Sequence, residues 1–401
     1  MTAGLLLEPV ELPPEPIVGA AALFALDPAV AHLNHGSYGA VPLPVQAEQQ
    51  RLRAEQERDP DGFFGTLPAR VAAARTAVAR ALGIDPVRLA LVNNVTEAVA
   101  VALDSVSLAP GEEILVTDHS YGVVARAAER RAAECGAVLR TVRLPLELAE
   151  PPDPQSALDG FAGLVLAAVG PRTRVVILDR VTSPTARAVA TGPLLSALAT
   201  RGVVTMVDAA HAPGMLPLAP EVALADFWFG NLHKWAFAPR PTALLAVGPA
   251  WGERIRPLTY SWEHERGFPA AVEWRGTCDY TAWLAAPGGP ALLARLGPER
   301  VREHNERLAR HGQWLLVERG GLRPLPGSVG VSMRAVRLPA GVAETEEAAR
   351  GLVATVRQRL GARIAVRPWA GGGVLRISAQ VYNRAAEYQA LATGLAGLLK
   401  G

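Results

Sequence analysis

The chain contains one internal lysine, Lys234, within the segment FWFGNLHKWAF. The other lysine, Lys400, stands next to the last residue, and all remaining members of the 40 Lys plus Arg residues are arginines. Arginine stays protonated in proteins, whereas a desolvated lysine can lose its proton and form a Schiff base with a carbonyl group. Lys234 is therefore a candidate covalent nucleophile, and the alternative is a leftover surface lysine.

An aspartate, Asp208, ends the apolar run VVTMVD upstream of this lysine. A carboxylate at the mouth of a buried strand can pair with a protonated pyridine nitrogen and keep a pyridoxal ring electron-poor, so that the ring accepts a carbanion formed at a substrate Cα. The alternative for Asp208 is a helix N-cap. Together with the internal lysine, this aspartate indicates a pyridoxal phosphate enzyme.

The elements that must position these residues follow from a repeated pattern. Short apolar runs end in polar residues and are separated by Ala-, Leu- and Arg-rich stretches long enough for helices; the runs are RLALVNN, EILVTD, RVVILDRV, GVVTMVDAAH and TALLAVG. This pattern is typical of a parallel sheet covered by helices on both faces. Ligands bind at the carboxyl ends of such strands, which makes the polar residues there the candidates for a site.

Pro and Gly residues from GPAWGERIRP to AAPGGP indicate a domain boundary. Beyond it come a helical stretch, ERVREHNERLARHGQWLLVERG, and the strand-like runs VGVSMRAVRLP, ARIAVRP and VLRISAQ. We therefore predict an N-terminal arm over 1–30, an α/β cofactor-binding domain with a mainly parallel sheet over 31–255, and a smaller α+β domain over 256–401.

Composition excludes several other classes of protein. The 401 residues are 50% hydrophobic and 19% charged, which is typical of a globular chain. The net charge of +2, without a basic block, argues against a nucleic-acid partner. The start MTAGLLLEPVELPPEP lacks a basic region, and no apolar run could span a bilayer, so we expect a cytoplasmic protein without a membrane partner. The spacing of Cys135 and Cys278 supports neither a disulfide nor a metal site.

Six ordered segments resemble the signature segments of the isopenicillin N epimerase-like enzymes, in the class V aminotransferase group of fold-type I pyridoxal phosphate enzymes. They run from Leu33 to Asn383 and read LNHGSYGAVP, NNVTEAV, VDAAHAPG, GNLHKW, RGTCD and VLRISAQVYN. The resemblance implies a fold-type I large domain, pyridoxal 5'-phosphate as cofactor, an amino-acid substrate, and a homodimer with shared active sites.

The resemblance also implies roles around the cofactor ring. Lys234 would bind the cofactor covalently, Asp208 would pair with the ring nitrogen, and His211 would lie by the phenolic oxygen. Tyr121, in TDHSYG, occupies the position of the ring-stacking aromatic residue, and His119 is an alternative for that role, because stacking needs only a flat π-face.

The cofactor phosphate needs several converging donors, preferably at the start of a helix. The resemblance implies donors at Asn94, Val95, Thr96, Asn231 and His233. The alternative for the first three is a plain capping sequence, which Thr96 would satisfy. Thr277, in RGTCD, matches a threonine that reaches the phosphate of the neighbouring subunit.

Substrate binding is implied for three residues. Arg376, in VLRISAQ, resembles the arginine that holds the substrate α-carboxylate, and Asn34 is a second, weaker candidate. Arg180 stands where relatives commonly have histidine, near the cofactor, so it could mark a different substrate or reaction.

The reaction type has to be chosen among several fates of the same carbanion. Lys234 can remove the Cα proton and assist departure of a β-substituent, whereas epimerisation needs a second proton donor on the opposite face of the ring. We therefore predict β-elimination from a cysteine S-conjugate (a C–S lyase of secondary metabolism, as in antibiotic biosynthesis) slightly ahead of epimerisation, with decarboxylation or transamination third. A nucleotide-binding α/β protein is disfavoured, because the chain has no G-x-G-x-x-G or Walker-type run.

Overall fold

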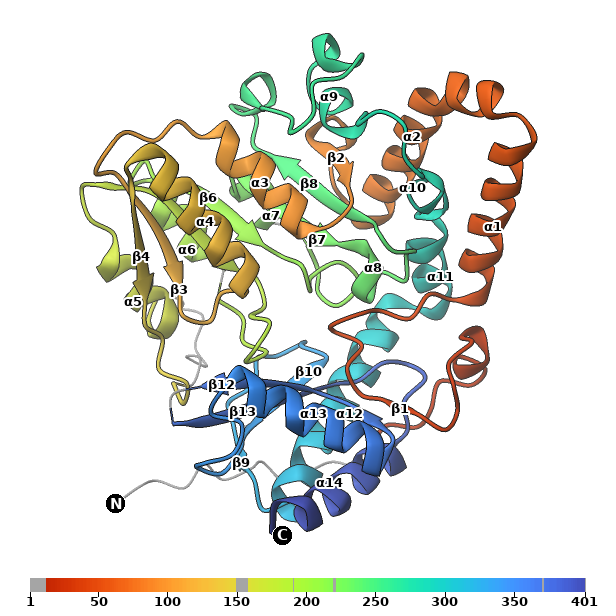
Figure 1. The fold of residues 1–401 in the computed structure, drawn as a ribbon, viewed down its shortest axis with the longest axis vertical. Coiled ribbons are helices and arrows are strands. Elements are labelled where there is room, and N and C mark those ends of the chain that lie inside the picture. Colours follow the sequence, from red (N-terminus) through yellow and green to blue (C-terminus); the bar gives the residue numbers. More distant parts are fainter. Residues whose placement is uncertain (1–11, 149–157, 190, 219–220, 370, 401) are drawn as a thin grey trace. The chain divides into compact units, whose positions relative to one another are not determined.

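The computed structural model describes residues 12–148, 158–189, 191–218, 221–369 and 371–400, and Figure 1 labels their elements. The first eleven residues of the predicted arm 1–30 lie outside this part of the chain. Two compact units are present. The large unit comprises 41–182 and 188–295, and the small unit comprises 1–40, 183–187 and 296–401, in each case as far as these residues are described.

The large unit is built on a sheet that has seven strands within the described residues, in the order β2-β8-β7-β6-β5-β3-β4. The strands are β2 (Leu89–Val92), β3 (Glu113–Thr117), β4 (Val138–Val142), β5 (Thr173–Asp179), β6 (Val204–Asp208), β7 (Phe227–Asn231) and β8 (Ala243–Val247). Neighbouring strands from β7 to β4 are parallel, and β8 runs antiparallel to β7 and β2. The predicted mainly parallel sheet is confirmed.

All five predicted apolar runs form strands, as β2, β3, β5, β6 and β8, but the prediction missed two other strands. The missed strand β4 lies at the edge of the sheet, and each of its residues is exposed or half-buried, so it has no continuous apolar run. The missed strand β7 is the FWFGN segment directly before the lysine motif, and its five residues are all buried.

Helices cover both faces of this sheet. In the large unit they are α1 (Leu43–Arg58), α2 (Pro60–Leu82), α3 (Val95–Ser105), α4 (Gly122–Cys135), α5 (Gly160–Ala168), α6 (Gly192–Ala199), α7 (Glu221–Leu224), α8 (Leu232–Trp235), α9 (Ala270–Glu273) and α10 (Thr281–Ala285), and α11 (Gly288–Leu296) ends at its boundary. Short 3-10 helices are η1 (Ala21–Leu23), η2 (Pro86–Arg88), η4 (Gly252–Arg254) and η5 (His264–Arg266).

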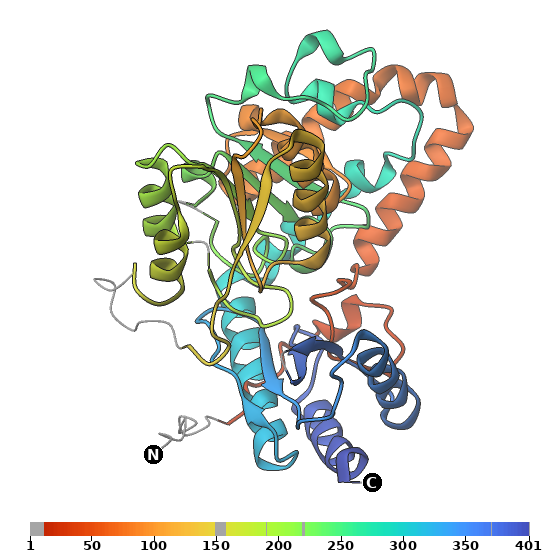
Figure 2. The same ribbon diagram turned by 60° about the vertical axis from the view of Figure 1, so that its left-hand side comes forward.

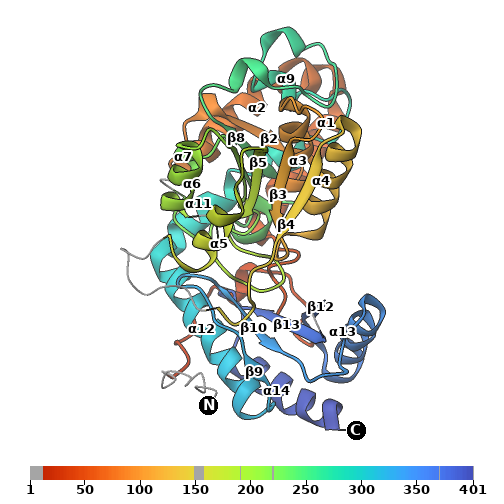
Figure 3. The same cartoon turned by 90° about the vertical axis from the view of Figure 1, so that its left-hand side faces the viewer.

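Two hydrophobic cores lie on the two faces, because successive strand residues point in opposite directions. In β5, Val175 and Ile177 pack in the core that includes α3 and α4. Val176 and Leu178 pack in the other core, with α5 and α6. Figure 3 shows α3 and α4 on one side of the sheet and α5 and α6 on the other. With both faces covered, the carboxyl ends of the strands are the edge at which a ligand site is expected.

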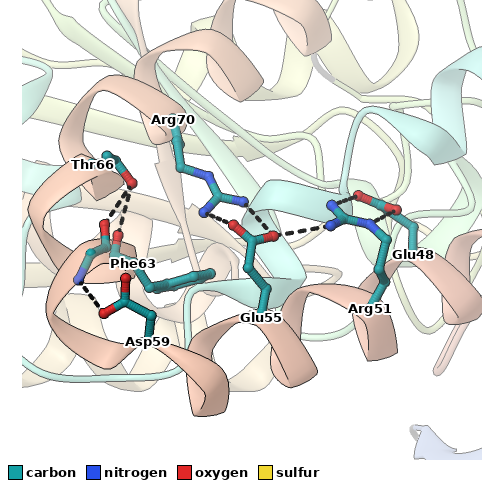
Figure 4. Close-up of polar contacts among 8 residues, drawn as sticks. Glu48, Arg51, Glu55, Asp59, Phe63, Thr66 and Arg70 are labelled. Carbon is teal, nitrogen blue, oxygen red and sulfur yellow. Dashed lines mark hydrogen bonds and ion pairs between the residues drawn. The ribbon is translucent and has the colours of Figure 1, made fainter.

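A tight helical hairpin, α1 and α2, flanks this sheet (Figure 4). Asp59 ends α1 and caps α2, accepting a hydrogen bond from the backbone N–H of Gly62 at 3.0 Å. Glu55 bridges the two helices: its carboxylate is 3.0 Å from the guanidinium of Arg51 and 2.7 Å from that of Arg70. The cap and the ion pairs together stabilise the sharp reversal between the helices.

The small unit has a four-stranded antiparallel sheet within its described residues, in the order β12-β13-β10-β9. Its elements are β1 (Ala31–His32), α12 (Pro298–Glu318), β9 (Arg323–Pro324), β10 (Met333–Arg337), α13 (Glu346–Leu360), β11 (Ala362–Arg363), β12 (Ala365–Trp369), β13 (Gly372–Ser378) and α14 (Ala385–Lys400). Helices α12 and α14 pack against each other in this unit; in Figure 2 they are the long cyan helix and the last, dark-blue helix. A Cβ on Gly312 of α12 would lie 2.4 Å from the Tyr388 ring of α14, so the glycine permits this close packing.

The two units end at other residues than the predicted domains 31–255 and 256–401. Residues up to 295 belong to the large unit because α10 packs against α1 and α2. Residues up to 40 belong to the small unit, where β1 pairs with β11. In the part of the chain that the structure describes, no helix is long and apolar enough to cross a membrane.

Candidate active site

Lys234 lies on α8, which begins directly after β7 ends. Its Nζ is 3.4 Å from Nε2 of His211. His211 follows β6, which is the parallel neighbour of β7, and the carboxyl ends of parallel neighbours meet at one edge of a sheet. The fold therefore brings together a lysine and a histidine that were predicted from separate motifs.

Asp208, the last residue of β6, is only 2% exposed. Its Oδ1 accepts a hydrogen bond from the backbone N–H of Ala210 at 2.9 Å, whereas Oδ2 is buried and has no partner among the described residues. Burial raises the pKa of Asp208, and the Ala210 N–H and the charge of Lys234 oppose that rise. A buried carboxylate oxygen without a donor is costly, so this site suits a group that brings an N–H of its own.

A second buried carboxyl group, Asp179, stands beside Asp208. It ends β5 and pairs in register with Asp208 on β6. Burial raises the pKa of Asp179 well above its ordinary value, and the nearby charge of Asp208 adds to this rise. The sequence prediction gave Asp179 no role, although its position at a strand end was a signal for one.

The expected phosphate-binding turn joins β2 to α3. Asn94 is the N-cap of α3 and accepts a hydrogen bond from the backbone N–H of Glu97 at 2.9 Å, so the capping residue is Asn94 rather than Thr96. Asn231 Oδ1 accepts from the N–H of Val95 at 3.1 Å and ties this turn to the end of β7. Thr96 is exposed in the first turn of the helix.

His233, directly before the lysine, is oriented by Thr242. The His233 Nδ1 lies 2.7 Å from the Thr242 carbonyl oxygen, to which it can donate. Burial lowers the pKa of His233 to about 4, with a further contribution from the charge of Lys234, so the ring is neutral. The backbone N–H of Thr242 also lies 3.2 Å from Nδ1, so the contacts with Thr242 are compatible with a hydrogen on either ring nitrogen, and the contact of His233 with a phosphate stays a prediction.

The two aromatic candidates for ring stacking differ in burial. His119 has no exposed surface: its Nε2 is 3.0 Å from the Leu144 carbonyl oxygen, and its ring meets Phe161 edge-on at 5.6 Å. Tyr121, at the start of α4, is 38% exposed. Because protein already covers the His119 ring, Tyr121 is the candidate with an accessible π-face.

Arg180 makes an ion pair within the chain. Its guanidinium is 3.1 Å from the carboxylate of Glu221, and both side chains are largely buried. Its backbone N–H donates to the carbonyl oxygen of Asp208 at 2.7 Å. Arg180 therefore braces the end of β6 and already has a carboxylate partner, Glu221, which the sequence did not reveal.

Thr277 is exposed on the segment between α9 and α10. Arg275 anchors this segment to the β2–α3 turn: its guanidinium is 3.1 Å from the carboxylate of Glu97 and 2.9 Å from Oδ1 of Asn93. Thr277 itself stays exposed on this anchored segment.

Arg376, on β13, occupies a polar pocket of the small unit. Its Nη2 donates to Asn34 Oδ1 at 2.9 Å and to Ser37 Oγ at 3.2 Å, and its Nη1 donates to the carbonyl oxygen and the hydroxyl of Ser183. Gly36 permits the close approach of this segment to β10, because a Cβ there would lie 2.7 Å from Sδ of Met333. Asn34 therefore holds the predicted arginine in place.

No carboxylate of the described residues pairs with this buried guanidinium. Its Nε is also buried without a partner, and burial, with the charge of Arg367, lowers the pKa of Arg376 to about 10. A buried cation is costly unless an anion compensates it. The pocket is therefore prepared for an anionic group with carboxylate geometry.

These residues fit pyridoxal 5'-phosphate. The unpartnered Asp208 oxygen suits the protonated ring nitrogen, Lys234 suits the aldehyde, and the start of α3 suits the phosphate. Such a donor set on a mainly parallel sheet, with a small antiparallel sheet in a second unit, defines a fold-type I pyridoxal phosphate enzyme.

The family follows from comparison with known proteins. The family model described as "Aminotransferase class-V" matches residues 46–391, and the chain belongs to this family. It is 37% identical to the isopenicillin N epimerase of Streptomyces clavuligerus over 393 residues, covering 93% of this chain and 96% of that enzyme. It is 30% identical to the putative L-cysteine desulfhydrase 2 of Oryza sativa subsp. japonica, covering 93% and 85% of the two chains.

A solved structure is similar in fold. A cystine C–S lyase in complex with its reaction product cysteine persulfide matches with a TM-score of 0.79, over 92% of this chain and 97% of that chain, at 19% identity. The predicted cofactor, family and fold are confirmed by these comparisons, and the roles of individual residues stay predictions.

Proposed function

We propose that the protein is an amino-acid epimerase that inverts the configuration at Cα with pyridoxal phosphate as its cofactor. The observation that carries the proposal is the 37% identity to isopenicillin N epimerase, sustained over nearly the full length of both chains. The identity to a cysteine desulfhydrase is lower, at 30%. This reverses the order predicted from the sequence, in which β-elimination stood first.

Two buried groups of the large unit serve the cofactor. When bound, pyridoxal phosphate holds the substrate amine and withdraws electrons from Cα, which makes the Cα–H bond acidic. Asp208 Oδ2, which lacks a donor among the described residues, would accept a hydrogen bond from the ring nitrogen. The start of α3, with Asn94, Val95 and Thr96, would hold the phosphate at the positive end of the helix.

The substrate is bound by its carboxylate and loses its Cα proton to a lysine. Arg376 pairs with the α-carboxylate, because it is a buried cation without an acidic partner in the described chain. Asn34 orients Arg376 through the bond to Nη2. Lys234 would hold the cofactor and, on its side of the substrate, would take the Cα proton.

Inversion needs a second proton carrier on the opposite side. Tyr121 fits this role best, since its ring is accessible while His119 is enclosed. Its hydroxyl can return a proton to Cα, and its ring can pack on the cofactor. Tyr121→Phe keeps the ring and removes the hydroxyl; it should therefore retain Cα–H exchange through Lys234 but lose inversion.

The reaction is tested in deuterated water with a panel of amino acids that includes isopenicillin N and cysteine S-conjugates. An epimerase returns intact substrate that is deuterated and inverted at Cα, detected by mass spectrometry and chiral chromatography. Release of a thiol with pyruvate and ammonia, without inverted substrate, would overturn the proposal and establish a C–S lyase.

The C–S lyase is the second candidate, and one observation favours it. The similarity to a putative L-cysteine desulfhydrase also extends over 93% of the chain. Lys234 alone suffices for this reaction, because the same amine can take the Cα proton and return it to the departing sulfur. Tyr121→Phe would then leave turnover intact.

The active unit in this proposal is a homodimer. Thr277 is exposed, and the segment that carries it is anchored through Arg275 to the β2–α3 turn. An exposed threonine next to an anchored turn can donate to a phosphate held by a second copy of the chain, so each active site draws on both copies.

A further inference from the structure

Three side chains form a hydrogen-bonded row at the carboxyl edge of the large sheet. The indole Nε1 of Trp235 is 3.3 Å from Nδ1 of His211, and Nε2 of the same imidazole is 3.4 Å from Nζ of Lys234. Trp235 and His211 are both 1% exposed. The row therefore runs from a buried indole, through a buried imidazole, to the lysine amine.

The chemistry of the indole decides which imidazole nitrogen carries the proton. An indole N–H can only donate a hydrogen bond, so Nδ1 of His211 must supply a lone pair. A neutral imidazole then has its hydrogen on Nε2, and this hydrogen faces Nζ of Lys234, which can accept it when the lysine nitrogen carries no charge, as when it is bound to the cofactor. The opposite tautomer would set the N–H of His211 against the N–H of Trp235.

The backbone next to Trp235 has little room to move. Gly214 has a φ of +87°, and a Cβ there would lie 2.2 Å from the carbonyl oxygen of Trp235. A Cβ on Gly289 would lie 2.3 Å from the carbonyl oxygen of Ala236. The residues after Lys234 are thus packed between two glycines, and this packing holds the indole in its position against His211.

We infer that Trp235 is a positioning residue that fixes His211 in its Nε2–H tautomer, so that the imidazole presents a hydrogen-bond donor toward Lys234 and the cofactor atoms bound there. The inference rests on the proposed roles of Lys234 and His211 in the active site. Trp235 touches neither substrate nor reacting atoms in this account and acts through His211.

The tautomer is read directly from nitrogen spectra of protein labelled with [15N]histidine. The chain has eight histidines, and the signals of His211 are assigned by their loss in His211→Asn. In the wild-type protein with the cofactor bound, Nδ1 of His211 should resonate as an unprotonated nitrogen and Nε2 as a protonated one. If the wild-type spectrum shows the hydrogen on Nδ1, the inference is wrong. This result needs no Trp235 variant, so it can be obtained even if that variant does not fold.

The matched comparison uses two equally buried tryptophans. Trp235→Phe should shift His211 from one tautomer to a mixture, because Nδ1 loses its donor. Trp228 lies on β7 and is also 1% exposed in the wild-type protein. Its replacement, Trp228→Phe, should leave the tautomer of His211 unchanged. A Trp235→Phe spectrum identical to the wild type would overturn the inference. These spectra do not depend on which reaction is catalysed, so failure of the epimerase proposal would be seen separately in the turnover assay.

Discussion

Replacement of Arg376 by alanine should raise the KM for the amino-acid substrate and leave the cofactor bound. Arg376 belongs to the small unit, where its partners are Asn34, Ser37 and Ser183. The proposed cofactor contacts of Lys234 lie in the large unit. The substitution thus removes a carboxylate partner without removing a cofactor ligand.

The size of the effect follows from the kind of bond that is lost. A hydrogen bond to a charged group contributes roughly 1.5–3 kcal/mol. Because every 1.4 kcal/mol is a factor of ten, KM should rise about 10-fold to 150-fold. Arg376→Lys keeps the charge but not the planar fork, and its KM should lie between those of the wild type and the alanine variant.

The assay compares initial rates over a range of substrate concentrations with the visible absorbance of the bound cofactor. Arg367→Ala is the matched control: this arginine lies on the adjacent strand β12, its side chain is 56% exposed, and it pairs with Glu346 at 3.3 Å. Its KM should stay at the wild-type value. An unchanged KM in Arg376→Ala, or loss of the cofactor from that variant, would refute the carboxylate assignment.

Three further predictions concern the cofactor and the pH. Lys234→Arg should abolish the visible absorbance of the bound cofactor and turnover with an unchanged circular dichroism spectrum, whereas Lys400→Arg should retain both. Thr277→Ala should retain the cofactor less tightly, and the wild type should sediment as a dimer; an active monomer would contradict this. Burial raises the pKa of Glu273 from 4.5 to about 7, so the folded state holds a proton that the unfolded chain has released. The free energy of unfolding should therefore fall as the pH rises from about 5 to about 7, by an amount on the order of 3 kcal/mol, and Glu273→Gln should remove this slope in chemical denaturation.

The sheet and the lysine were predictable because their signals are local. Runs such as VVILD and VVTMVD are apolar throughout, since each strand is buried on both faces, and helices of ordinary composition separate them. Lys234 was identified by chemistry alone, because arginine replaces lysine everywhere else inside the chain. The edge strand β4 lacked such a signal, since half of its environment is solvent.

The contacts within the site were harder to predict, because they depend on which residues from distant parts of the sequence lie next to each candidate site residue in the fold. In the sequence, His119 is a candidate for stacking on the cofactor ring. In the folded chain, Phe161 and the carbonyl group of Leu144 contact its imidazole and enclose it. The ion pair between Arg180 and Glu221 is likewise visible only in the folded chain. Neither contact produces a periodic sequence pattern from which it could be predicted.

The Arg376 pocket has a consequence for the order in which the chain can fold during synthesis. Asn34 and Arg376 are separated by 342 residues, and Ser183 comes from a short segment between two stretches of the large unit. The ribosome releases the start of a chain long before its end. The contact between Asn34 and Arg376 can therefore form only after nearly the whole chain has left the ribosome. The strands next to Lys234 and Asp208 can form their sheet before that. A nascent chain would therefore complete the proposed cofactor site first and the proposed binding site for the substrate carboxylate last.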